Sequence, residues 1–171
     1  MSIQIKYLEN LTGEELDFLL QSLPLITILI GAVEDDLTDQ EVSYGEKIVH
    51  IRSYNEKELL LEFYEQAEKT FVYHIQNLVA ELPKDPASRN AEISVRLEKL
   101  NDILAKLDQR VAGYLYKGLV SFAHHIARAE GGVLGFFSIS KAEEAWINLP
   151  MLTPISIFEE DEASEEDDKE A

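Results

Sequence analysis

The chain has 171 residues, 46% of them hydrophobic and 28% charged, and its formal net charge is −18. This length favours one domain that buries its own core without disulfides or metal ions. The absence of cysteine excludes a disulfide framework, thiolate metal sites and a cysteine nucleophile. The acidic excess disfavours nucleic acid and anionic membranes as partners, and it favours cations and basic proteins.

The N-terminal region is predicted to form a buried helix. Thr12 and the acids after it indicate a helix start, and the helix is expected to run to about Val33 with a kink or division at Pro24. Residues 18–33 are the most apolar segment, but Gln21, Ser22 and Pro24 interrupt it. It falls short of the roughly 20 apolar residues that a membrane span needs. With no signal-peptide pattern at residues 1–6, we expect a cytoplasmic protein without membrane insertion.

An acidic segment follows this helix. Five carboxylates lie within eight residues, at Glu34, Asp35, Asp36, Asp39 and Glu41. Such oxygen-rich loops bind hard divalent cations, and Ca²⁺, Mg²⁺ and Mn²⁺ all accept carboxylate ligands. The alternative is purely structural, because Thr38-x-x-Glu41 is also a capping box and acids in a first turn favour the helix dipole. Both interpretations stay open from these residues.

Helical periodicity continues through the rest of the chain, so the predicted fold is all-α. Helices are expected from Thr38 to about Tyr54 and from Asn55 to about Leu82, with a break at residues 83–86. Beyond the break, apolar residues from 93 to 114 alternate steps of four and three, which is typical of antiparallel helices packed in a bundle, and the helical pattern continues to residue 126. Gly113 and Gly118 are expected to mark a kink or a close helix contact.

A second acidic segment resembles the first. Glu130 precedes a glycine-rich, apolar loop at residues 131–137, and Ser140-x-x-Glu143 opens a short helix that ends before Pro150. This pattern also has a capping interpretation. The sequence lacks nucleotide-binding and nucleophile-elbow motifs, and its four histidines have no metal-ligand spacing. We therefore expect no enzyme and no organic cofactor. Trp146 is expected to anchor the last helix to the bundle.

The two acidic segments resemble those of the TerB-like family, named for tellurite-resistance proteins. Members typically show Ala-Asp-Gly before an aliphatic-Ser/Asp-x-x-Glu helix start, and later Gly-Gly-x-Leu-Gly-Phe before Ile-Ser-x-x-Glu. Residues 131–136 and 139–143 match the later element, whereas Glu34 replaces the usual Asp and Asp35 the glycine. The family's acid positions fall on Glu34, Glu41, Glu130 and Glu143.

The resemblance covers residues 23–149 and implies a compact all-helical bundle of two related halves whose clustered acids bind a divalent metal. Residues 1–157 are predicted to form this domain and residues 158–171 an acidic, disordered tail. The resemblance implies a role in stress response, tellurite resistance or signalling. The expected function is binding of Ca²⁺, Mg²⁺ or Mn²⁺ by both segments. The alternative is a metal-free interaction module whose helical faces and acidic tail engage basic proteins. The expected metal ligands are Glu34, Asp35, Asp36, Glu41, Glu130 and Glu143.

Overall fold

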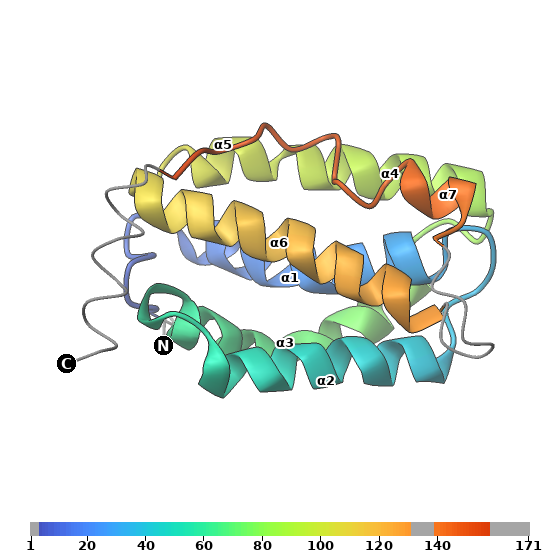
Figure 1. Cartoon of the computed structure of the whole chain (residues 1–171), viewed down its shortest axis with the longest axis horizontal. Coiled ribbons are helices and arrows are strands. Elements are labelled where there is room, and N and C mark those ends of the chain that lie inside the picture. Colours follow the sequence, from blue (N-terminus) through green and yellow to red (C-terminus); the bar gives the residue numbers. More distant parts are fainter. Residues whose placement is uncertain (1–3, 131–138, 158–171) are drawn as a thin grey trace.

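The computed structural model describes residues 4–130 and 139–157, and within them every regular element is a helix (Figure 1). The helices are α1 (Gly13–Gly31), α2 (Asp39–Asn55), α3 (Glu58–Glu81), α4 (Pro86–Glu98), α5 (Leu100–Leu104), α6 (Gln109–Glu130) and α7 (Lys141–Glu144). This confirms the predicted all-α bundle. The relatedness of its two halves stays a prediction.

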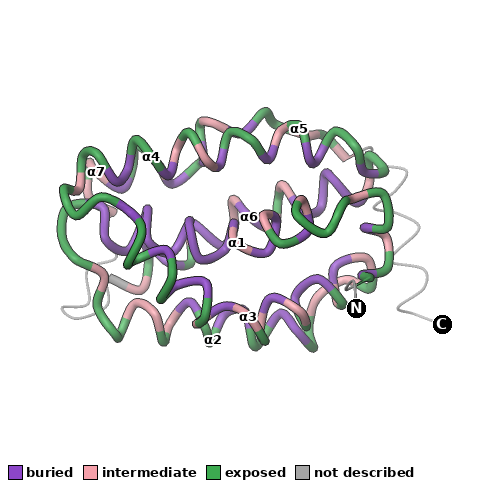
Figure 2. Tube along the Cα trace, turned by 180° about the vertical axis from the view of Figure 1, so that it is seen from behind, coloured by how far each residue is buried: buried purple, intermediate pink, exposed green. Residues whose placement is uncertain are grey.

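Helix α1 is the centre of the bundle. It contacts α2 and α3 on one side, α4 and α5 on the other, and α6 along its length. Every residue from Ser22 to Gly31 is buried, and Figure 2 shows α1 as buried almost throughout. A helix that is apolar on all sides must be covered on all sides. The arrangement of the other helices therefore follows from the composition of this one.

The start of α1 is as predicted, but Pro24 does not divide the helix. Thr12 accepts a hydrogen bond from the Glu15 amide (3.2 Å), and the Glu15 carboxylate accepts one from the Thr12 amide (2.9 Å). Pro24 lies inside the continuous helix although proline removes one backbone hydrogen bond there. The packing around residues 22–31 compensates for this loss. None of the described helices is both long and apolar enough to cross a bilayer.

The amphipathic stretch after residue 86 folds back on itself instead of continuing straight. The turn at residues 105–108 separates α5 from α6, and Asp108 Oδ1 accepts a hydrogen bond from the Arg110 amide at the start of α6 (3.0 Å). The expected close contact at Gly118 is confirmed. A Cβ there would lie 2.9 Å from the Tyr64 hydroxyl, so a side chain at this position would separate α6 from α3.

After α7 the chain returns along the bundle toward the start of α6. Asn101 of α5 holds this return segment by donating to the Met151 carbonyl (2.9 Å) and accepting from the Thr153 amide (2.8 Å). The segment reaches Gly113, where a Cβ would lie only 2.6 Å from Ile157 Cγ1. The predictions for the glycine-rich loop and for the disordered tail fall on residues 131–138 and 158–171, outside the described residues.

Candidate functional site

The first acidic segment is the connection between α1 and α2. The side chains of Glu34, Asp35 and Asp36 are exposed. Asp36 Oδ1 lies 4.0 Å from Nη1 of Arg89, but the Asp36 side chain is 96% exposed, so solvent weakens this pair. These three carboxylates are therefore available to solvent and to a ligand.

Two buried side chains of α4 hold the same connection from beneath. Arg89 Nη2 donates to the backbone carbonyls of Ala32 and Asp35, both at 2.5 Å, and Asn90 Nδ2 donates to the Val33 carbonyl at 2.8 Å. A charged donor to a buried carbonyl makes a stronger hydrogen bond than a neutral one. The loop backbone is consequently fixed by α4, while its acidic side chains remain outside.

Arg89 and Asn90 were not identified from the sequence, although a signal was present for Arg89. Arg89 lies in the first turn of α4, where a cation is opposed by the positive end of the helix dipole. A buried arginine at such a position requires compensating acceptors from elsewhere in the fold. The backbone carbonyls of the α1–α2 connection supply them.

The carboxylate of Glu41 is engaged in a helix cap. Its Oε2 accepts a hydrogen bond from the Thr38 amide (2.7 Å), and Thr38 Oγ1 accepts one from the Glu41 amide (3.3 Å). The Glu41 stem also packs on α1, since a Cβ at Gly31 would lie 3.5 Å from Glu41 Cβ. The capping interpretation of this motif is confirmed, and one oxygen of Glu41 is already occupied.

The second acidic segment has the same cap in a more buried environment. Glu143 Oε2 accepts from the Ser140 amide (2.6 Å), and Ser140 Oγ accepts from the Glu143 amide (3.1 Å). Glu143 is only 4% exposed, and its Oε1 has no hydrogen-bond partner among the described residues. Glu130 is the last residue of α6, and its side chain lies outside the described part of the chain.

The predicted metal ligands are only partly brought together. Glu41 at the start of α2 and Ala129 at the end of α6 line one pocket, so the two acidic segments meet at the same end of the bundle. Across residues 4–130 and 139–157, however, no three His, Asp or Glu side chains converge as metal ligands. Metal binding by the two segments stays a prediction.

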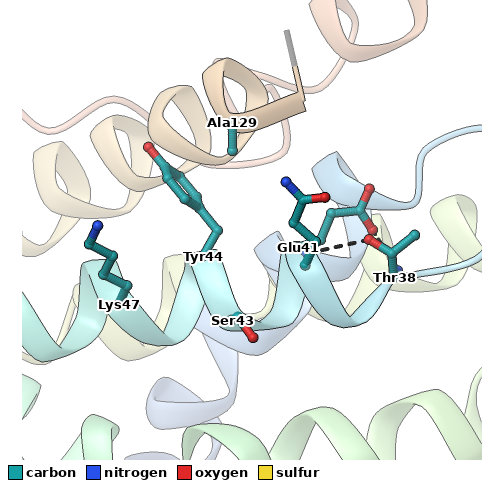
Figure 3. A pocket seen from close by; sticks show the side chains of 7 residues that line it. Thr38, Glu41, Ser43, Tyr44, Lys47 and Ala129 are labelled. Atoms are coloured by element: carbon teal, nitrogen blue, oxygen red, sulfur yellow. Dashed lines mark hydrogen bonds between the residues drawn. The ribbon is translucent and has the colours of Figure 1, made fainter. Parts of the chain in front are cut away.

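A pocket lies between α2 and α6 at this end of the bundle. Its volume is about 460 Å³, and its lining residues are Thr38, Gln40, Glu41, Ser43, Tyr44, Lys47 and Ala129. In Figure 3, Tyr44 and Lys47 rise from α2 toward the end of α6 that carries Ala129. The Tyr44 ring is half-buried and packs against the core. The site thus combines an aromatic wall, an acid and a lysine.

The histidines make no catalytic arrangement with one another among the described residues. His50 pairs with Glu68, and His124 Nε2 lies 2.9 Å from Asn148 Oδ1. His74 is buried on α3, and its Nε2 is 3.5 Å from Asp17 Oδ1 without a hydrogen bond. Burial lowers the pKa of His74 below its usual value, and nearby Asp17 opposes this shift. His74 is therefore a neutral core residue at neutral pH.

Comparisons with known proteins give no relative. No protein-family model matches this chain, and no curated protein or solved structure is significantly similar to it. The function must therefore be inferred from the chain itself.

Proposed function

We propose that this chain is a non-enzymatic helical binding domain, and that the pocket between α2 and α6 takes a basic, amphipathic segment of a partner protein. The observation that supports it is the combination of the half-buried Tyr44 in an open pocket with exposed acids just before the same helix. An aromatic anchor surrounded by polar residues is typical of interface hot spots.

The shape of the pocket limits what binds there. A volume of about 460 Å³ accommodates anchoring side chains of a peptide segment but not a whole flat surface. An apolar side chain of the partner would pack on Tyr44, and a basic one next to it would face Glu41. The exposed carboxylates of Glu34, Asp35 and Asp36 would attract the basic segment and accelerate its association.

The cap geometry favours this proposal over the metal hypothesis. The carboxylates of Glu41 and Glu143 each accept a backbone hydrogen bond within their own helix start, as the structural alternative expected. Those two positions therefore have a sufficient explanation in helix capping. A binding domain that uses the helical face of α2 needs no metal ion.

Divalent-cation binding at the first acidic segment is our second proposal. It is favoured by the three consecutive exposed carboxylates of Glu34, Asp35 and Asp36, of which only Asp36 has a cation of the described residues within ion-pair distance. The resemblance to the TerB-like family points the same way, and a role in stress response or tellurite resistance rests on that resemblance alone. Metal-dependent stability is the test.

A synthetic amphipathic helix rich in lysine and leucine is a suitable probe for the first proposal. Binding would be followed by fluorescence anisotropy, with amide shifts mapped by NMR. Tyr44→Ala should weaken binding about tenfold or more, since truncating a hot-spot aromatic costs roughly 2 kcal/mol. The matched control is Tyr54→Ala, because Tyr54 lies on the same helix but is 65% exposed.

The Tyr54→Ala protein should bind the probe as the parent chain does, with amide shifts centred on residues 38–47 and 129. Equal weakening in both variants would show general adhesion of a basic peptide to an acidic protein. Shifts centred on another face, or unchanged affinity in Tyr44→Ala, would overturn the proposed site.

A further inference from the structure

Helix α6 is an exception to the acidic character of the chain. Acids outnumber bases 33 to 15 overall, yet α6 contains Arg110, Lys117 and Arg128 and a single acid, Glu130, at its last position. Its exposed face also carries His124 and His125. A helix with this charge pattern in so acidic a protein provides a local surface for an anion.

The three cations of α6 share one face with a histidine. Arg110, Lys117, His124 and Arg128 follow at steps of seven, seven and four, which place side chains on the same side of a helix. We call these four residues the cationic stripe. Its C-terminal part lines a shallow pocket of about 350 Å³ formed by Tyr116, Lys117, Val120, Ser121, His124, His125 and Arg128. The stripe is therefore grooved over its C-terminal part, from Lys117 to Arg128.

A buried cation lies beneath this groove. Arg52 of α2 is 9% exposed, and its guanidinium donates to the Tyr64 hydroxyl (2.8 Å), the Gly118 carbonyl (2.9 Å) and the Ser121 hydroxyl (2.8 Å). These partners are all neutral oxygens, so they do not cancel its charge. Because Ser121 also lines the groove, the positive charge of Arg52 adds to the potential there.

The described chain ends next to α6, and an acidic segment follows it in sequence. Ile157, the last described residue, packs at Gly113, which lies between Arg110 and Lys117 on α6. Residues 159–171 follow at once and contain nine acids and one lysine. Residues 158–171 reach about 46 Å when extended. The stripe from Arg110 to Arg128 is about 27 Å long, so the tail is long enough to span it.

We propose that the acidic tail, residues 159–168, binds along the cationic stripe of its own chain. Exposed ion pairs are weak one at a time. Tethering at Ile157 compensates for this, because a short linker holds the tail at an effective concentration in the millimolar range. An acidic segment of another protein would lack that advantage. A basic partner that engages the tail would have to separate it from the stripe first.

The absence of cysteine allows a direct test on the full chain. A nitroxide spin label on Ser164→Cys would be the only label site, and paramagnetic broadening of amide signals would report where the tail lies. We expect broadening along residues 121–128 at low salt, and its loss near 1 M salt, where charges are screened beyond about 3 Å. Lys117→Gln with Arg128→Gln should abolish it, whereas Lys69→Gln, an exposed lysine on α3, should leave it unchanged.

A second variant keeps the test independent of changes in the folded body. Glu159→Gln, Glu160→Gln, Asp161→Asn and Glu162→Gln together alter only the tail, and they should remove the same broadening. Unchanged broadening in either charge variant would overturn the proposal. So would broadening that appears only between spin-labelled and isotope-labelled molecules in a mixture, since that result would show binding to a second copy.

Discussion

The two acidic segments contain the same helix-start motif in different surroundings. Thr38-x-x-Glu41 and Ser140-x-x-Glu143 form the same reciprocal cap. Glu41 is half-buried at the edge of a pocket, whereas Glu143 is 4% exposed and leaves Oε1 without a hydrogen-bond partner among the described residues. The comparison shows that the motif specifies the cap, while tertiary packing decides whether the glutamate can also meet a ligand.

The two segments also differ in how they are held. The backbone of the first segment is held by a side chain of another helix, because Arg89 of α4 donates hydrogen bonds to it. The second has a buried glutamate that caps its own short helix. Substitutions of Arg89 and of the capping glutamates measure how much each contributes to stability.

The largest effect is expected at Arg89. Arg89→Ala should lower the free energy of unfolding by about 3 kcal/mol, because two backbone carbonyls lose a charged donor. Arg96→Ala is the matched control on the same helix. Its ion pairs with Glu81 and Glu92 are on the surface and should contribute less than about 1 kcal/mol. Urea unfolding followed by circular dichroism measures both, and equal losses would contradict the role given to Arg89.

The two capping glutamates should then differ from each other. Glu143→Ala should cost about 2 kcal/mol, since it removes a cap bond and leaves a buried space. Glu41→Ala should lower the free energy of unfolding by about 1 kcal/mol, because this site is more open and only the cap hydrogen bond is lost. The same unfolding experiment compares them. If Glu41→Ala were the more damaging change, burial would not distinguish the two segments.

A divalent cation should distinguish them as well. Thermal unfolding in EDTA and then in Ca²⁺, Mg²⁺ or Mn²⁺ at fixed ionic strength should show a saturable stabilisation, about 1.4 kcal/mol at ten times Kd. The Glu34→Gln/Glu41→Gln protein should lose it if the first segment is the site. No stabilisation would show that the first segment binds no divalent cation. Equal stabilisation in both proteins would show general charge screening, and the capping interpretation would then be sufficient.

The smallest effect is a pH dependence of stability from His74, a residue outside both segments. Its pKa is lowered in the folded protein, so below about pH 6.5 the unfolded chain binds more protons than the folded one. Stability should therefore fall as pH decreases from 6.5 toward the folded pKa. His74→Gln should reduce this slope in urea titrations from pH 7.5 to 5. An unchanged slope would show that His74 does not titrate in this range.

The sequence predicted helix starts well where the signal lies within a few neighbouring residues. Thr12, Thr38 and Ser140 each start a helix as expected, because a capping box needs only residues three apart. The turn at residues 105–108 was missed, since the apolar spacing continues through it, although Asp108 caps the start of α6 and is a local helix-start signal. Pro24 was expected to kink or divide α1, and the division is wrong, because the helix is continuous through this residue.

The candidate site was less accessible to sequence reasoning. The acidic segments and Glu41 were identified, but the pocket also depends on Tyr44, Lys47 and Ala129, which come together only in the fold. Arg52 and Arg89 were missed for the same reason. The position of Arg89 near a helix start was a local signal, but apart from the Lys84 carbonyl the acceptors of both arginines lie 12 or more residues away, and no local pattern identifies such distant groups.

The central position of α1 has a consequence for how the protein is made. α1 ends at Gly31, but α6, which covers it along its length, begins only at Gln109. At about 5–20 residues per second, a ribosome needs roughly 4–16 s to synthesise the intervening chain. During that interval the most apolar helix of the protein has been made but cannot be enclosed. The nascent chain is then most exposed to aggregation, and chaperones have their clearest target in residues 16–31.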